Sequence, residues 1–149
     1  MIRPAAGKDF DDARAIMREY VESLPAGHVC TQDFKAELID LENRYTLILL
    51  AYAEGQPSGC VAMRQLGPAT CELKRLYVRP AYRGIGLGRQ LIDRFLTEAR
   101  QCNYTKIRLD SMPEMAAAQA LYRKLGFHEI PKYADNPEGT ICMELALTR

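Results

Sequence analysis

The pattern of apolar and polar residues along this chain predicts a mixture of strands and helices. The clearest part of this pattern is a run of β-forming residues that ends at Val78. Pro80, a glycine-rich turn and a helical pattern follow it. The helical pattern consists of apolar residues spaced three and four positions apart, namely Leu87, Leu91, Ile92, Phe95, Leu96 and Ala99. We therefore expect a strand over residues 71–78 that passes through a tight turn into a long amphipathic helix.

The residues before this unit predict one short strand, two helices and two longer strands. Ile2–Pro4 predicts the short strand, and Asp9 is expected to cap a first amphipathic helix. A second amphipathic helix is predicted to start at Thr31. Two antiparallel strands are predicted next, at 46–53, which is apolar on both faces, and at 58–66.

The residues after the long helix predict a strand, a helix and a final pair of strands. The strand at 105–109 should lie parallel to 71–78, because a helix crosses between the two. Ser111 and Glu114 have the spacing of a capping box for an alanine-rich helix over 116–125. The final strands are predicted at 127–132 and 140–147, around a loop at 133–139.

These elements follow the order β-α-α-β-β-β-α-β-α-β-β. This order predicts an α/β (α+β) fold with a mixed central sheet of about six to seven strands and about four helices. The length of 149 residues, with 48% hydrophobic and 26% charged residues, is that of one ordinary globular domain. No linker, repeat or low-complexity tract interrupts the sequence, so residues 1–149 are expected to form a single domain.

Charge and composition exclude several classes of partner. Twenty basic and nineteen acidic residues leave a net charge of +1, which provides no bulk field to attract nucleic acid or an anionic membrane. The N-terminus lacks the apolar core of a signal peptide, and the most apolar run, 47–53, is far too short to span a bilayer. We therefore expect a cytoplasmic protein without a nucleic acid or membrane partner.

The five cysteines are odd in number and include no C-x-x-C pair, which argues against a disulfide framework and against a metal site. If Leu66 pairs with Thr70 across the turn between them, the register of the flanking strands is set. Cys60 should then lie opposite Leu76 and apart from Cys71. We interpret the cysteines as small hydrophobic residues.

The turn before the long helix carries glycine at alternate positions between two arginines: Arg83, Gly84, Gly86, Gly88 and Arg89. Glycine lets the backbone adopt conformations closed to other residues and lets a ligand approach the main chain. Because this turn opens a helix, amide N–H groups and the positive end of the helix dipole would meet an anion there. A phosphate or diphosphate is the predicted ligand, with a purely structural turn as the alternative.

The spacing of these glycines separates the loop from two common nucleotide-binding motifs. A dinucleotide fingerprint G-x-G-x-x-G that starts at Gly84 would need its third glycine where Arg89 stands. The P-loop sequence is absent as well. A nucleotide-binding α/β domain is therefore disfavoured.

Residues 83–88 read R-x-x-G-x-G, which resembles the acyl-CoA pyrophosphate loop of the GNAT superfamily of N-acetyltransferases. A second segment, A-x-x-L-Y-x-x-x-G-F from Ala118 to Phe127, resembles another motif of that family. The resemblance covers residues 71–127 by motif and the rest of the chain by the order of its elements. It implies the GNAT acyl-CoA N-acyltransferase fold, with acetyl-CoA as co-substrate.

The resemblance further implies an enzyme that moves an acetyl group from acetyl-CoA to a primary amine of a small-molecule or amino-acid-like acceptor. In this family the amine attacks the thioester directly in a ternary complex, so no nucleophilic residue is required. A protein N-terminus or a lysine is the second acceptor class. A non-catalytic acyl-CoA-binding regulatory module is the alternative from another functional class. Dimers are common in the family, which leaves a homodimer open.

By the same resemblance, two residues carry catalytic roles. Tyr122, in the second motif, would act as general acid toward the leaving thiolate. Glu72 stands eleven positions before Arg83 and would act as base, directly or through water. The cofactor-binding residues that the resemblance implies are Leu76, Tyr77, Val78, Arg83, Gly84, Ile85, Gly86, Leu87, Gly88, Arg89, Ser111 and Ala118.

The sequence departs from the family pattern at one position. Many relatives carry an asparagine seven residues before the tyrosine, where it contacts the cofactor, whereas this chain has Met115. Ser111 is included above as a substitute for that contact. By position in the fold, residues 25–31, with His28, and the loop 133–139 would wall the acceptor pocket, and Arg75 would favour an acceptor that carries a carboxylate.

Overall fold

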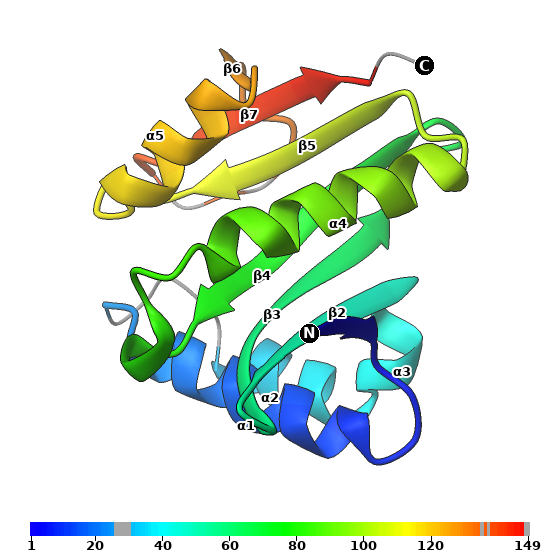
Figure 1. The fold of residues 1–149 in the computed structure, drawn as a ribbon. Helices are drawn as coiled ribbons and strands as arrows, with labels where there is room; N and C mark the ends of the chain where they lie inside the picture. The colour runs from blue at the N-terminus through cyan, green and yellow to red at the C-terminus, as the bar shows by residue number, and fades with distance from the viewer. Residues whose placement is uncertain (26–30, 135, 137, 148–149) are drawn as a thin grey trace.

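The computed structural model describes residues 1–25, 31–134, 136 and 138–147, and its strands and helices follow the predicted order (Figure 1). The strands are β1 (Ile2–Pro4), β2 (Leu47–Ala53), β3 (Gln56–Gln65), β4 (Thr70–Val78), β5 (Lys106–Ser111), β6 (His128–Ile130) and β7 (Ile141–Ala146). The helices are α1 (Asp9–Glu22), α2 (Thr31–Ile39), α3 (Leu41–Arg44), α4 (Leu87–Gln101) and α5 (Ala116–Lys124), with a 3-10 turn at Pro80–Tyr82. The prediction of about four helices missed α3, a single turn that continues α2 after a break at Asp40.

Seven strands of the described chain form one sheet in the order β1-β2-β3-β4-β5-β7-β6. Neighbouring strands are antiparallel except β4 and β5, which are parallel. The parallel pair is explained by α4, which crosses from the end of β4 to the start of β5. The mixed sheet and its connectivity are therefore confirmed.

Helices cover both faces of the sheet, and each side has its own apolar core (Figure 1). On one face, Leu91 and Phe95 of α4 pack in a cluster with Leu49 of β2. On the other face, Ile16 of α1 packs in a cluster with Leu50 of β2. Successive residues of β2 are thus buried on opposite faces, which explains its continuous apolar sequence. No helix in the described part of the chain is long and apolar enough to cross a membrane.

Strand β4 carries a bulge at Arg75. Cys60 of β3 lies opposite Tyr77, and the pairing then shifts because β4 has one residue more than β3. Arg75 has a φ of +59°, in the left-handed region that a residue other than glycine seldom adopts. The prediction that Cys60 lies opposite Leu76 is wrong by one residue for this reason.

Strands β4 and β5 pair at one end alone. Residues 70–72 of β4 lie opposite 106–108 of β5, whereas 73–78 have no β5 partner within the described chain. Strand β5 continues along β7 as far as Ser111. The two parallel strands therefore diverge toward the end where β4 meets the glycine turn (Figure 1).

The two predicted helix caps are wrong. Asp9 is the first residue of α1, and its carboxylate forms an ion pair with Arg3, with Oδ1 2.9 Å from Nη2. Ser111 is the last residue of β5, opposite Ile141, and Met115 occupies the cap position of α5. Sheet pairing has taken Ser111 out of the helix start, so the capping box does not form.

The four described cysteines divide by burial, and Cys30 lies outside the described residues. Cys60, Cys71 and Cys142 are buried, as expected for small hydrophobic residues, and Cys60 also donates a hydrogen bond from Sγ to the Arg75 carbonyl oxygen over 3.2 Å. Cys102, just after α4, is exposed. The interpretation as small hydrophobic residues is therefore wrong for Cys102.

Candidate active site

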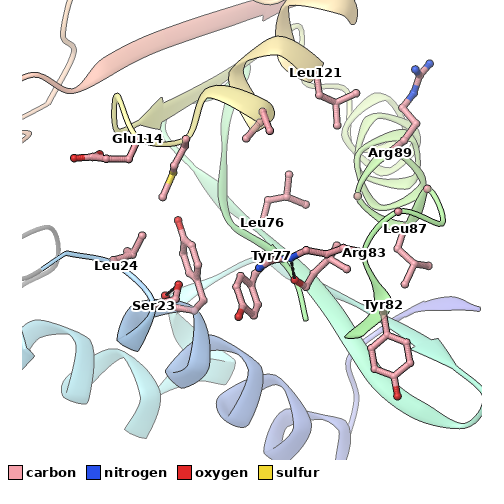
Figure 2. A pocket seen from close by; sticks show the side chains of 18 of the residues that line it. Ser23, Leu24, Leu76, Tyr77, Tyr82, Arg83, Leu87, Arg89, Glu114 and Leu121 are labelled. Atoms are coloured by element: carbon pink, nitrogen blue, oxygen red, sulfur yellow. Dashed lines mark hydrogen bonds between the residues drawn. The ribbon is translucent and has the colours of Figure 1, made fainter. Parts of the chain in front are cut away.

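A cavity of about 730 Å³ lies between the end of α1, the far end of β4 and the starts of α4 and α5. Figure 2 shows Leu76 and Tyr77 of β4 at its centre, with Arg83 and Leu87 toward α4 and Leu121 on α5. Ten of the predicted cofactor-binding residues line it: Leu76, Tyr77, Val78, Arg83, Gly84, Gly86, Leu87, Gly88, Arg89 and Ala118. The side chain of Ile85 is instead 60% exposed, and Ser111 lies elsewhere, as described below.

The glycine turn makes one end of this cavity suitable for an anion. Gly84 and Gly86 have φ values of +84° and +85°, and Gly86 occupies the cap position of α4. No side chain among the described residues caps this helix, so amide N–H groups of its first turn are available to a ligand. Arg83 and Arg89 line the same end and add positive charge. These groups fit a diphosphate.

Arg83 connects the turn back to the end of β4. Its Nε donates a hydrogen bond to the Val78 carbonyl oxygen over 2.8 Å, which is the dashed line beside Arg83 in Figure 2. Its guanidinium carbon lies 5.4 Å from the centre of the Tyr77 ring. The Arg83 side chain therefore lies against the last residues of β4, along which a cofactor arm would run.

A second, smaller cavity of about 50 Å³ occupies the place where β4 and β5 diverge. Four residues line both cavities, namely Tyr20, Leu76, Met115 and Ala118. The cavities therefore adjoin, and the small one extends the large one away from the glycine turn. Met115, which stands where many relatives carry asparagine, lies at this junction.

Tyr122 of α5 lines the small cavity and is buried. Its ring packs against Phe127, with ring centres 5.6 Å apart. Burial raises the pKa of the Tyr122 hydroxyl above its ordinary value, and the nearby groups of Tyr20 and Asp110 raise it further. The hydroxyl therefore keeps its proton at neutral pH and can donate a hydrogen bond.

Gln119, one turn before Tyr122, fixes the entry to α5. Its Nε2 donates hydrogen bonds to the Met112 carbonyl oxygen over 2.7 Å and to Ser111 Oγ over 3.3 Å. Ser111 lines the small cavity and not the large one, which ten of the other predicted cofactor-binding residues line. Sequence reasoning missed Gln119, although a polar residue within an alanine-rich helix was a visible signal.

Glu72 is buried, but it lines neither cavity. Its carboxylate accepts hydrogen bonds from Arg64 Nη2 over 2.6 Å and from Tyr133 Oη over 2.5 Å. The Lys74 ammonium group lies 4.0 Å from Glu72 Oε1 and 3.8 Å from Asp110 Oδ1. Any contact between Glu72 and an acceptor would therefore have to run through Lys74 or water. Sequence reasoning named neither Lys74 nor Asp110.

Arg75 is committed to a protein partner. Its Nη2 and Nε donate hydrogen bonds to the two carboxylate oxygens of Glu37 over 2.9 and 3.1 Å. The expectation that Arg75 offers its charge to an acceptor carboxylate is therefore not met. Of the segment expected to wall the acceptor pocket, Pro25 lines the large cavity, and His28 lies outside the described residues.

Comparison with known proteins places the chain among acetyltransferases. It matches the model of the Acetyltransferase (GNAT) family over residues 13–127. It is 31% identical over 149 residues to an N-acetyltransferase of Schizosaccharomyces pombe. This match covers 95% of this chain and 91% of that protein. An IAA acetyltransferase of Azospirillum brasilense is 36% identical over 80 residues, or 53% of this chain and 52% of that protein.

A solved structure agrees with these relatives. The yncA protein of Salmonella typhimurium, determined with its cofactor acetyl-CoA, has a TM-score of 0.80 and 26% sequence identity. The likeness covers 99% of this chain and 94% of that chain. The fold is thus shared over nearly the whole length of both chains.

Proposed function

Because this chain belongs to the acetyltransferase (GNAT) family, whose enzymes use acetyl-CoA, we propose that it acetylates the primary amine of a small-molecule or amino-acid-like acceptor. The observation that carries this proposal is the pair of adjoining cavities, which joins an anion-binding glycine turn to a buried tyrosine hydroxyl. A partly matching relative, named as an IAA acetyltransferase, supports a small acceptor.

The large cavity has the features needed to hold acetyl-CoA. The first turn of α4, with Arg83 and Arg89, would bind the diphosphate. Main-chain groups of Leu76 and Val78 would bind the pantetheine arm and the thioester carbonyl, because this part of β4 has no β5 partner in the described chain. The thioester would then lie where the two cavities adjoin.

The small cavity would hold the acceptor amine, so that transfer is a direct displacement. The amine nitrogen forms a bond to the carbonyl carbon, and the bond from that carbon to sulfur breaks. Tyr122 would donate a proton or a hydrogen bond to the departing thiolate, because its hydroxyl is protonated at neutral pH. Positioning two substrates in line can supply a large part of such a rate.

The amine must lose a proton to become nucleophilic. Glu72 is the proposed acceptor of that proton, but its position supports a relay through Lys74 or water and not direct contact. The proton would leave the acceptor nitrogen and reach the Glu72 carboxylate through these groups.

Two measurements test the proposal. Calorimetric titration with acetyl-CoA should show saturable binding, and an assay of thiol release should show CoA formed with at least one member of an amine panel. The panel should hold aliphatic amines, amino acids and a peptide with a free N-terminus. Binding without CoA release would favour the non-catalytic module, release with the peptide alone would favour a protein acceptor, and no binding would overturn the assignment of the cavity.

A further inference from the structure

The small cavity carries charges of both signs. Lys74 of β4 and Asp110 of β5 line this cavity from the two neighbouring strands. The Lys74 Nζ and Asp110 Oδ1 atoms are 3.8 Å apart. The Lys74 Nζ also lies 4.0 Å from Glu72 Oε1. Both distances exceed those of an N–H···O hydrogen bond. The ammonium group thus lies between two carboxylates and is hydrogen-bonded to neither.

Asp110 is held in place on the side away from Lys74. Asn136, in the loop between β6 and β7, donates a hydrogen bond from Nδ2 to Asp110 Oδ2 over 2.6 Å. This bond orients the carboxylate and directs its other oxygen, Oδ1, toward Lys74. The Asp110 side chain is 25% exposed, which is consistent with its place at the cavity wall.

The other charged groups nearby already have close partners. The Glu72 carboxylate accepts hydrogen bonds from Arg64 and Tyr133, and it does not line the cavity. Arg75 lines the cavity but is bound at two positions by Glu37. Among the described lining residues, Lys74 and Asp110 are therefore the charges that an acceptor would meet.

We propose that Lys74 and Asp110 select a zwitterionic α-amino acid as the acceptor, with its carboxylate at Lys74 Nζ and its ammonium group at Asp110 Oδ1. This inference rests on the proposed function and names the chemistry of its acceptor. An α-amino acid carries opposite charges two bonds apart through its α-carbon, so one small molecule can reach both groups. Each of them then gains the short charge-assisted hydrogen bond that the 3.8 Å pair does not provide.

The same geometry disfavours acceptors without a carboxylate. A simple amine or a peptide N-terminus would occupy Asp110 and leave the Lys74 ammonium group without an anionic partner from the ligand. A partly buried charged group that gains no partner from the ligand costs binding energy, which is how such a site discriminates. The apolar walls, Leu73, Leu76 and Ala118, add no charge that could compensate.

The test compares glycine, L-alanine and L-methionine with the amides of the same three, which keep the α-amine and lose the carboxylate. We expect Lys74→Met to lower the ratio of kcat/KM for the acids to kcat/KM for the amides about tenfold or more, because loss of a proton relay would affect both sets alike and cancel in the ratio. Lys74→Arg should restore part of the loss, because it keeps the charge. Asp110→Asn should lower kcat/KM for acids and amides alike. Lys106→Met, at an exposed position of β5, and Asp11→Asn, on the exposed side of α1, are the matched controls.

Binding to the CoA-loaded protein, measured by calorimetry, examines the same inference without turnover. Saturable binding of at least one acid, weakened by Lys74→Met, supports it, whereas equal binding of acids and amides or no binding of the acids overturns it. Melting temperatures and acetyl-CoA affinity of the variants show whether they remain folded. Failure of the proposed function looks different, because no amine of any kind would then release CoA. CoA release that is indifferent to the carboxylate would overturn this inference alone.

Discussion

Glu37 of α2 holds Arg75, the residue at the bulge of β4, in a two-point ion pair with distances of 2.9 and 3.1 Å. Both side chains are nearly buried, at 11% and 13% exposed. The pair fixes the one residue of β4 whose backbone is left-handed, and the strand beyond it lines both cavities. A contact with α2 therefore anchors β4 at the residue just before the segment that would hold the cofactor.

The first prediction concerns the stability of this pair. Glu37→Gln should lower the free energy of unfolding at pH 7 by about 3 kcal/mol, because it leaves the Arg75 guanidinium buried without a counter-charge. Chemical denaturation of both proteins measures the difference. Glu129→Gln removes an exposed carboxylate that pairs with Arg123 over 3.9 Å, and as a control it should change stability little. A loss no larger than that of the control would contradict the role of the pair.

The pair also predicts a pH dependence. Burial alone would raise the pKa of Glu37, but the hydrogen bonds and charge of Arg75 outweigh burial, so the pKa lies below its ordinary value of 4.5. A carboxylate with a lowered pKa adds stability above its unfolded pKa and loses it as the pH falls through the folded pKa. The stability difference between wild type and Glu37→Gln should therefore shrink below about pH 4.5, as denaturation at several pH values would show. A constant difference down to pH 3 would contradict this linkage.

The bulge also shows where sequence reasoning stops. The strand, turn and helix around Gly84 and Gly86 were predictable, because glycine, proline and apolar spacing are local signals that the structure then follows. Nothing about an arginine at position 75 indicates a left-handed backbone. The side chain of Arg75 pairs with Glu37, which is distant in sequence and adjacent only after folding.

The same limit applies to the candidate site. The cofactor cavity could be anticipated because nearly all its predicted residues belong to one contiguous strand, turn and helix. Lys74 and Asp110 belong to two strands, and they come together at the point where those strands diverge. Ser111 was misread because the S-x-x-E spacing is local, whereas its pairing with Ile141 is decided by the sheet. Motifs thus predicted residues of the large cavity, whereas strand geometry brings together the charged residues of the small one.

A further prediction separates the fold of the glycine turn from its ligand. Gly88 is helical, and a Cβ built there would meet the nearest atom, Val78 Cγ2, at an ordinary 3.9 Å. Gly88→Ala should thus stabilise the free protein by about 0.5 kcal/mol, because alanine is the better helix former. The added methyl group lines the cavity, and it should weaken acetyl-CoA binding about tenfold by displacing the diphosphate from the helix N–H groups.

Thermal melting and calorimetry measure these two effects on the same protein. Gly67→Ala is the matched control, since a Cβ there meets nothing within 4 Å and the residue lies away from the cavity. It should leave the affinity for acetyl-CoA unchanged. Wild-type affinity in Gly88→Ala would show that the turn does not grip the diphosphate.

Glu72 gives a prediction that distinguishes a proton relay from a structural role. Glu72→Gln keeps the shape of the side chain but removes its charge, so it should slow turnover if the carboxylate receives the proton of the amine. Tyr133→Phe removes one hydrogen bond to Glu72 and keeps the charge, which makes it the matched control. We expect the rate to fall more in Glu72→Gln than in Tyr133→Phe, with similar losses of melting temperature. Equal rates in the two variants, or an unaltered pH–rate profile in Glu72→Gln, would assign Glu72 a structural role alone.

The last prediction concerns Tyr122. Tyr122→Phe removes one hydroxyl from the small cavity and keeps the ring that packs on Phe127. If the hydroxyl protonates the thiolate, kcat should fall on the order of 100-fold, while the affinity for acetyl-CoA and the melting temperature change little. Tyr82→Phe, in the large cavity beside the glycine turn, is the matched control and should keep its rate.

The pH dependence sharpens this test. Burial, together with the groups of Tyr20 and Asp110, raises the pKa of Tyr122 above the ordinary 10.0 of tyrosine. The wild-type rate should therefore show no loss from deprotonation of Tyr122 up to about pH 10, because the acid remains protonated. The wild-type rate could instead begin to fall as the pH rises toward 10, with no such fall in Tyr122→Phe. That result would mean that the Tyr122 hydroxyl is exposed to solvent and that its pKa is not raised. An unchanged kcat in the variant would remove Tyr122 from the mechanism and leave water or the acceptor itself to protonate the thiolate.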